Sequence, residues 1–190
     1  GDTGKAALAG FADVEGTKII VFYPKNGVSP IQEKQMVTQK GANTFVVGIH
    51  GNFDDAQTGV KNIFAACQGR ELPYALSSAN SINIGRLAPQ IMYYFRSYRD
   101  LLDAGKIKLG DEVNYTVPTG NFGDILAGYY AKRMGLPVGK LVCASNQNNV
   151  LTDFLTTGTY TAKREFFKTT SPSMDILVSS NLERLLYHVT

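Results

Sequence analysis

Short apolar runs alternate with amphipathic stretches along most of the chain. A run of six or so apolar and β-branched residues is typical of a buried strand, whereas apolar residues spaced three or four apart indicate a helix. Runs of the first kind predict strands at 18–23, 44–49, 112–117 and 141–144. Patterns of the second kind predict helices at 5–12, 54–67 and 125–134, and a further helix that begins at Pro30 and ends before Gly41.

Local signals set the limits of these helices. Ser29 precedes Pro30, and a serine cap followed by proline at the first helical position is a common helix start. A longer helical stretch covers 82–105, and Pro89 within it should kink the helix or mark its true beginning. Four aromatic residues of this stretch have the spacing of a buried helix face: Tyr93, Tyr94, Phe95 and Tyr98.

The order of strands and helices predicts an α/β protein. Alternation of strand and helix favours mainly parallel sheets with helices on both faces, a three-layer α/β/α arrangement. We expect two lobes: 1–78 in a small α/β lobe, 79–111 as a connecting helical segment, and 112–190 in a large α/β lobe. Ligands of open α/β sheets bind beyond the carboxyl ends of the strands.

Composition excludes several classes of protein. The 190 residues are 44% hydrophobic and 18% charged, which is ordinary for a globular protein. The net charge of +3 is spread along the chain, unlike the clustered stripe of a nucleic-acid-binding protein. No apolar run has the length of a membrane span. We therefore expect neither nucleic acid nor a membrane as a partner.

The two cysteines and two histidines are all isolated. Cys67 and Cys143 lie outside any CxxC spacing, which favours reduced thiols and a cytoplasmic protein. His50 and His188 have no neighbouring ligands, so we expect no metal site. The chain opens on GDTGKAAL without a methionine, and we expect it to be an excised part of a longer protein.

A glycine-rich turn offers the strongest candidate for ligand binding. The segment PTGNFGD joins a predicted strand to a predicted helix, with glycine at 120 and 123. Glycine permits close approach of the backbone, and a helix N-terminus favours an anion, most simply a phosphate. Asp124 would repel phosphate, so we expect it to cap the helix instead. The segment has neither the ending of an NTPase loop nor the GxGxxG dinucleotide fingerprint.

Two other segments carry weaker signals. Asn80, Ser81, Asn83 and Arg86 offer amides, a hydroxyl and a guanidinium, which can grip a phosphate or simply form a turn before a helix. The residue types alone favour neither the phosphate site nor the turn. The opening GDTG also precedes a helix, and there a capped helix start is the simpler interpretation.

Together the motifs resemble those of threonine synthase, a pyridoxal-phosphate (PLP) enzyme of the tryptophan-synthase-β, or fold type II, group. Four segments occur in the order and spacing of that family: GDTGKAAL, YPKNGVSPIQEKQM, SSANSINIGRLAPQIMYYF and VPTGNFGDILAGYYAKRMGLPVGKL. The resemblance extends to about residue 160. It implies a lyase of threonine biosynthesis that converts O-phospho-L-homoserine and water to L-threonine and phosphate.

The resemblance also assigns residues to the two ligands. It implies that Gly120, Asn121, Phe122, Gly123 and Asp124 hold the cofactor phosphate, and that Asp2 lies beside the pyridine ring. It implies that the substrate phosphate is held by Thr3, Ser81, Asn83 and Arg86, with Gln32 and Ser29 in a loop that reaches the same group.

The family's Schiff-base lysine lies in a Phe-Lys-Asp motif upstream of GDTG, and the chain contains no such motif. Neither Lys5 nor Lys168 lies in a Phe-Lys-Asp sequence. The resemblance therefore implies that the catalytic lysine precedes Gly1, and we expect the stretch alone to be inactive.

Two rival functions stay open: a module that only binds a phosphorylated small molecule, and a related lyase such as a serine or threonine dehydratase. The dehydratase is disfavoured because its substrate carries no phosphate. The oligomeric state is not predicted.

Overall fold

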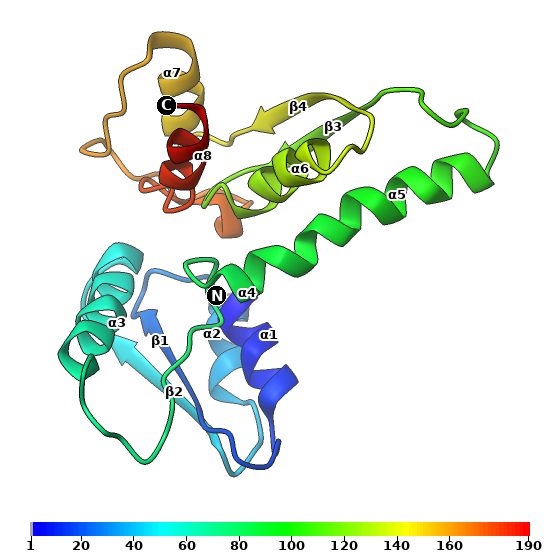
Figure 1. The fold of residues 1–190 in the computed structure, drawn as a ribbon. Coiled ribbons are helices and arrows are strands. Elements are labelled where there is room, and N and C mark those ends of the chain that lie inside the picture. Colours follow the sequence, from blue (N-terminus) through cyan, green and yellow to red (C-terminus); the bar gives the residue numbers. More distant parts are fainter. Residues whose placement is uncertain (1) are drawn as a thin grey trace. The chain divides into compact units, whose positions relative to one another are not determined.

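The computed structural model describes residues 2–190. Gly1, the residue upstream of which the catalytic lysine is expected, lies outside the described residues. The chain divides into two compact units, with the boundary between Ala79 and Asn80. Each unit contains two parallel strands, β1 with β2 and β3 with β4 (Figure 1). The α/β class with parallel sheets is therefore confirmed. In the part of the chain described, no helix is both long and apolar enough to cross a membrane.

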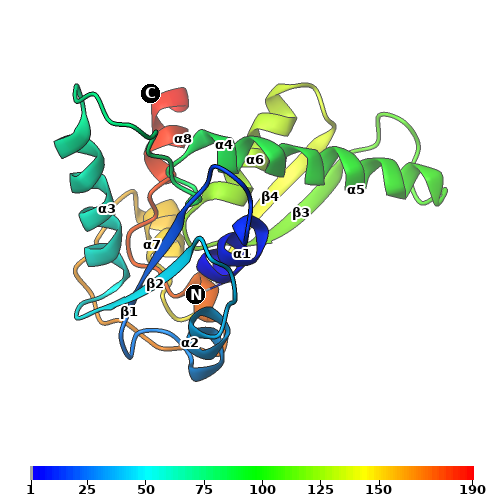
Figure 2. The ribbon, with the colours of Figure 1, turned by 90° about the horizontal axis from the view of Figure 1, so that it is seen from below.

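The first unit consists of a two-stranded sheet and three helices. Its elements are α1 (Asp2–Phe11), β1 (Ile19–Pro24), α2 (Pro30–Val37), β2 (Thr44–Ile49) and α3 (Phe53–Cys67). Figures 1 and 2 show α1 and α3 on opposite sides of the sheet. The core of this unit is small: Leu8, Tyr23 and Met36 are buried, and they join α1 and α2 to one face of the sheet.

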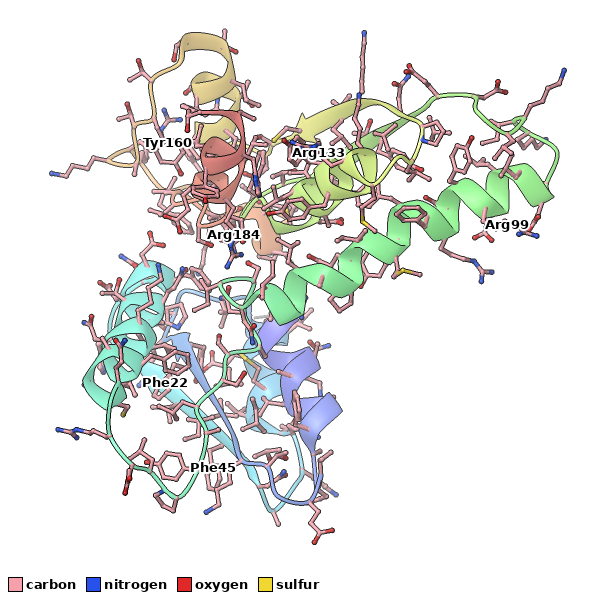
Figure 3. All side chains as sticks on the ribbon, viewed as in Figure 1. Phe22, Phe45, Arg99, Arg133, Tyr160 and Arg184 are labelled. Carbon is pink, nitrogen blue, oxygen red and sulfur yellow. The ribbon has the colours of Figure 1, made fainter. Side chains whose placement is uncertain are left out.

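The opposite face of this sheet is largely accessible. Successive side chains of a strand point to opposite faces, and Ile20, Phe22, Phe45 and Val47 are all exposed (Figure 3 labels Phe22 and Phe45). Helix α3 contacts β1 but has no fully buried residue. The first unit is therefore packed mainly through α1 and α2.

The second unit is larger and better packed. Its elements are α4 (Ile84–Leu87), the 3₁₀ turn η1 (Ala88–Gln90), α5 (Ile91–Asp103), β3 (Val113–Pro118), α6 (Gly123–Arg133), β4 (Val138–Ala144), α7 (Val150–Thr157), the 3₁₀ turn η2 (Pro172–Met174) and α8 (Leu182–Val189). Helix α6 contacts both β4 and α5. Six of its residues are buried, so it forms the centre of the unit.

Close packing of α5 on α6 explains one glycine of α6. A Cβ atom at Gly128 would lie 2.7 Å from the ring of Tyr94, a distance that packed atoms do not tolerate. Tyr94 and Tyr98 are each 4% exposed, and Tyr94 meets Tyr115 of β3 edge to face. Tyr93 is 59% exposed, so its predicted place on the buried face is wrong. It lies one residue, about 100° of helix rotation, from Tyr94.

The predicted strands and helices up to residue 144 agree with the structure to within a few residues. Pro89 lies in η1, where the long helical stretch is interrupted between α4 and α5, as its missing N–H requires. Helices α7 and α8 were not predicted from the sequence.

Candidate functional site

The turn between β3 and α6 has an unusual backbone. Strand β3 ends at Pro118 and α6 begins at Gly123. The residue before the helix, Phe122, has φ of +64° and ψ of 9°, in the left-handed region that non-glycine residues rarely adopt. Its side chain is 5% exposed, and burial in the core holds this conformation. Strain of this kind is often found where a backbone is shaped for a ligand.

Four carbonyl groups of this turn accept hydrogen bonds from the protein. Gly120 O accepts a hydrogen bond from Ser179 Oγ. Asn121 O accepts from the backbone N–H of Asn181 at 3.1 Å and from its side-chain Nδ2 at 3.0 Å. Phe122 O accepts from Leu126 N at 3.2 Å, and Asp124 O accepts from the hydroxyl of Tyr94 at 2.8 Å.

The N–H groups of the same turn have no such partners. Leu126 N is the first N–H of α6 bonded to a carbonyl of its own turn. Among residues 2–190, no acceptor is hydrogen-bonded to the backbone N–H groups at positions 121–125. Phe122, Gly123 and Ile125 are buried, and unpaired buried N–H groups are rare in proteins. Five consecutive N–H groups without an acceptor among the described residues, at the start of a helix, form a site that suits an anion.

The two glycines of the turn leave little room for a side chain. A Cβ atom at Gly120 would lie 3.0 Å from Cγ1 of Ile176, and one at Gly123 would lie 3.3 Å from Cβ of Ser81. Neither glycine has a positive φ, so space rather than backbone conformation requires glycine at both positions. Larger residues would push this backbone away from its neighbours and displace the N–H groups.

Asp124 does not cap α6, contrary to the sequence prediction. The N-cap position belongs to Phe122, and Asp124 is the second residue of the helix. Its Oδ1 is buried and has no hydrogen-bond partner among the described residues. Burial raises the pKa of the Asp124 carboxyl above its usual value.

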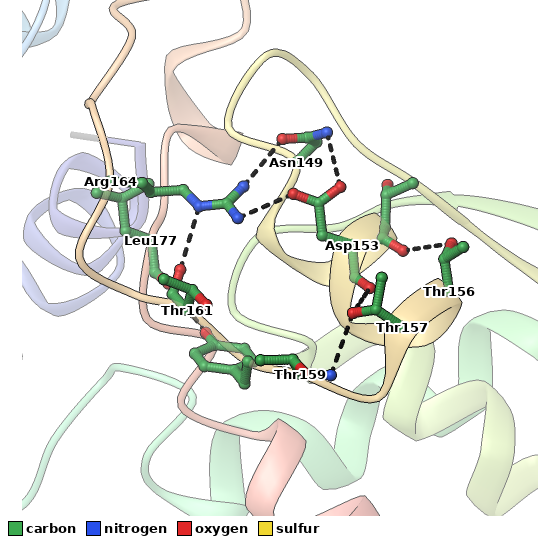
Figure 4. A network of polar contacts seen from close by, with 10 residues as sticks. Asn149, Asp153, Thr156, Thr157, Thr159, Thr161, Arg164 and Leu177 are labelled. Carbon is green, nitrogen blue, oxygen red and sulfur yellow. Dashed lines mark hydrogen bonds and ion pairs between the residues drawn. The ribbon is translucent and has the colours of Figure 1, made fainter.

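The segment that holds the turn is itself anchored by Tyr160. The Tyr160 hydroxyl accepts from Ser179 N at 2.8 Å and donates to Leu177 O at 2.9 Å. A polar network fixes the chain next to Tyr160: the Arg164 guanidinium pairs with Asp153 of α7 at 2.8 Å and also contacts Asn149 (Figure 4). Leu177 and Ser179 are thus held by contacts within the second unit.

Of the residues predicted to hold the substrate phosphate, Ser81 lies beside the turn. Its Cβ is the nearest atom to a Cβ built on Gly123. Asn83 caps α4, with its side chain accepting from Gly85 N at 2.9 Å. Arg86 lies in α4 and is exposed, and the structure describes no ion pair for it within residues 2–190. These three residues are in the same unit as the glycine-rich turn.

The other predicted residues belong to the first unit. Asp2 and Thr3 are exposed residues of α1. Ser29 and Gln32 form a capping box at the start of α2: Ser29 Oγ accepts from Gln32 N at 3.2 Å, and Gln32 Oε1 accepts from Ser29 N at 3.0 Å. Gln32 Nε2 also donates to Asp2 Oδ1 at 3.0 Å. The structure therefore brings Asp2, Ser29 and Gln32 together, with the two α2 residues engaged in helix capping.

The predicted catalytic lysine has no counterpart in the described structure. It was expected upstream of Gly1, and the described residues begin at Asp2. Its position relative to the glycine-rich turn therefore stays a prediction.

Sequence reasoning missed the residues that support the turn from the C-terminal side. Ser179, Asn181 and Arg184 contact residues that are 59 to 103 positions away in the chain. They occur in a short polar stretch without a motif of its own, and only the fold reveals their role. The one available signal was that the stretch has two adjacent serines and an asparagine before an amphipathic helix.

The sequence is similar to proteins named threonine synthase and to solved threonine synthase structures. The threonine synthase of Eremothecium gossypii is 46% identical over 189 residues, a match that covers 98% of this chain and 36% of that protein. The crystal structure of PLP-bound threonine synthase from Brucella melitensis superposes with a TM-score of 0.79 at 45% identity, covering 99% of this chain and 39% of that one. The chain is homologous to part of threonine synthase.

Other relatives of threonine synthase match equally well. Human threonine synthase-like 1 is 48% identical over 198 residues, covering 98% of this chain and 27% of that protein. The chain thus spans between about a quarter and two fifths of the length of these relatives. No protein-family model matches it. Its fold is the corresponding part of the fold type II, or tryptophan-synthase-β-like, fold.

The comparisons correct one expectation. The resemblance to threonine synthase was predicted to end near residue 160, whereas the matches cover 98% or more of the chain. The segment with Ser179, Asn181 and Arg184 is therefore part of the homologous region.

Proposed function

We propose that a protein carrying this chain is a threonine synthase, which converts O-phospho-L-homoserine and water to L-threonine and phosphate with PLP as cofactor. The observation that carries the proposal is the β3–α6 turn, with its carbonyls bonded to protein and five N–H groups without an acceptor among the described residues. Identity of 43–48% to threonine synthases and threonine synthase-like proteins supports the same assignment.

The residues of the turn suit the phosphate of PLP. A phosphate ester dianion accepts hydrogen bonds but donates none, and it matches a cluster of N–H donors at a helix N-terminus. Gly120–Asp124 would hold this group, and the positive end of α6 would stabilise its charge. When bound, PLP supplies the electron sink that makes the substrate carbons acidic. The protein's own contribution at this turn is to fix the cofactor by its phosphate.

Ser81, Asn83 and Arg86 would hold the second phosphate, that of the substrate. The planar guanidinium of Arg86 offers a fork of donors suited to phosphate oxygens. Arg86 would neutralise the charge that passes to the phosphate as its bond to the substrate carbon breaks. Within the first unit, Asp2 would lie beside the pyridine ring, with Gln32 donating to its carboxylate at 3.0 Å. Thr3, Ser29 and Gln32 are proposed to border the substrate phosphate.

The decisive experiment is product analysis with the full-length protein. Incubation with PLP and O-phospho-L-homoserine should release phosphate and L-threonine in equal amounts. Phosphate without threonine would indicate another lyase, and binding without turnover would indicate a binding module. Product analysis is needed because relatives with 48% identity carry the name threonine synthase-like rather than threonine synthase.

A second experiment tests the assignment of the catalytic lysine to a position before Gly1. The chain of residues 1–190 is incubated with PLP and then reduced with borohydride, and the protein mass is measured. The proposal predicts no covalently attached cofactor at any specific lysine. Stoichiometric attachment at Lys5 or Lys168 would contradict it. We expect the whole enzyme to work in the cytoplasm, where the two isolated cysteines of this chain stay reduced.

A further inference from the structure

Asn181 lies between the two proposed phosphate sites. It directly precedes α8 and is fully buried, at 0% exposure. Its side-chain Nδ2 donates to Asn121 O of the glycine-rich turn at 3.0 Å and to Ser81 Oγ at 2.9 Å. A single amide group thus connects the turn proposed for the cofactor phosphate with a residue proposed for the substrate phosphate.

Each polar atom of the Asn181 side chain has a hydrogen-bond partner. Its backbone N–H donates to Asn121 O at 3.1 Å, and its Oδ1 accepts from Nη1 of Arg184. An asparagine side chain has two N–H donors and one carbonyl acceptor, and all three are engaged here. A residue that only filled space would not need an amide in this position.

Arg184 strengthens the same connection from α8. Its Nη1 donates to Ser81 O at 2.8 Å and its Nη2 donates to Ile82 O at 2.7 Å (Figure 3 labels Arg184). The backbone at Ser81 and Ile82 is therefore held by a charged, two-armed contact. Arg184 in turn fixes the orientation of the Asn181 amide through its Oδ1.

These contacts prevent the turn and the Ser81 segment from moving independently. If either moved, the buried Asn181 amide would lose a partner, and an unsatisfied buried donor is strongly unfavourable. A ligand that orders one segment therefore favours the bound arrangement of the other. Such coupling between two sites is reciprocal.

We propose that Asn181 is a positioning residue that couples the two phosphate sites, so that occupation of one raises the affinity of the other. The ligand class at both sites is a phosphate monoester or phosphonate. The inference rests on the proposed function, because it takes Gly120–Asp124 and Ser81 as the two sites. It adds a residue outside both binding motifs that sets how strongly they act together.

The test measures coupling in the full-length protein. The dissociation constant of PLP is determined by fluorescence titration with and without a short alkyl phosphonate, at a concentration that saturates the PLP-bound protein and displaces no PLP from the turn. The phosphonate has no amino group to react with PLP. The ratio of the two constants is the coupling factor. The wild-type protein should show a factor of at least about 5, within the usual range for coupled sites. In Asn181→Leu, which keeps the side-chain size but not the amide, the factor should fall to about 1.

Asn148→Leu is the matched control. Asn148 is also buried, at 5% exposure, and its Nδ2 likewise has several acceptors: Phe167 O at 2.8 Å and Asp175 Oδ1 at 3.1 Å. Its contacts involve neither the turn nor Ser81. This variant should lose a similar amount of stability and keep the wild-type coupling factor.

Three results would overturn the inference: a coupling factor of about 1 in the wild type, a wild-type coupling factor in Asn181→Leu, or a loss of coupling in Asn148→Leu as large as that in Asn181→Leu. If Asn181→Leu does not fold, Asn181→Asp keeps the acceptor for Arg184 and removes the donor, and it should also lose coupling. A wild-type protein that binds no PLP would instead refute the proposed function, so the two failures are distinguishable.

Discussion

Two of the helix N-termini that carry residues assigned to a phosphate by the resemblance differ in the structure. At the start of α2, Ser29 and Gln32 bond to each other's backbone and side chain, so the end of the helix is closed by its own residues. At the start of α6, Phe122 has no side-chain cap and the first N–H groups have no acceptor within residues 2–190. A helix dipole alone does not make an anion site. The site also needs N–H donors that have no acceptor within the protein.

The largest effect is expected from filling the open helix end. In Gly123→Val the new side chain would press against Ser81 and Asn181 and shift the N–H groups of the turn. We expect the affinity for PLP to fall at least 100-fold, about 2.7 kcal/mol. PLP titration of the full-length variant measures this. Gly59→Val is the control, since a Cβ at Gly59 of α3 meets no atom within 4 Å. Retention of wild-type PLP affinity in Gly123→Val would contradict the assignment of the turn.

Removal of Arg86 separates the two phosphate sites. Arg86→Ala should raise the KM for O-phospho-L-homoserine about 10- to 100-fold, the usual consequence of losing a charged hydrogen bond. The dissociation constant of PLP should change less than about threefold. Steady-state kinetics and PLP titration of the same preparation give both values. Similar increases in the KM and in the dissociation constant of PLP would argue against two distinct anion sites.

A smaller effect is expected at the closed helix end. Ser29→Ala removes the acceptor for Gln32 N and should lower the free energy of unfolding by about 1 kcal/mol. Urea denaturation measures the change, and PLP affinity should stay at the wild-type value. The KM should rise less than about threefold, because Ser29 borders the substrate phosphate with a hydroxyl that is already engaged in the cap. A rise in KM without loss of stability would instead support direct contact of Ser29 with substrate.

The smallest effect concerns the pH dependence of stability. Because burial raises the pKa of Asp124 in the folded protein, the folded state holds the proton more tightly than the unfolded state. This carboxyl therefore destabilises the fold increasingly as pH rises from its unfolded pKa, about 3.9, through its folded pKa. Asp124→Asn should abolish that fall. Urea denaturation between about pH 3.5 and 6 tests it, and parallel curves for both proteins would show that Asp124 is not perturbed.

The open helix end was predictable from sequence, whereas its supports were not. Gly120 and Gly123 lie between an apolar run and an amphipathic run, a local pattern that indicates a strand, a turn and a helix. Pro89 likewise marked the break between α4 and α5 because proline has no N–H to donate. Local patterns of this kind act over a few residues, and they were sufficient for most elements before residue 145.

The contacts that keep the helix end open act over much longer separations. Ser179 and Asn181 lie 59 and 60 residues from their partners in the turn, and no local pattern indicates which carbonyls they bond. The left-handed Phe122 was also not foreseen, because an aromatic residue is a poor choice for that conformation and only core packing holds it there. The assignment of Asp124 to a helix cap was wrong because the N-cap position is taken by the left-handed Phe122, which the sequence did not indicate.

Hydrogen–deuterium exchange of the full-length protein compares the two helix ends most directly. Without PLP, the amides at positions 121–125 should exchange fast for a buried segment, whereas those at 32 and 33, already bonded to Ser29, should exchange slowly. PLP should slow exchange at 121–125 strongly and leave 32 and 33 unchanged. Loop amides that are equally protected without PLP, or that do not respond to it, would contradict the claim that this helix end is kept open for a phosphate.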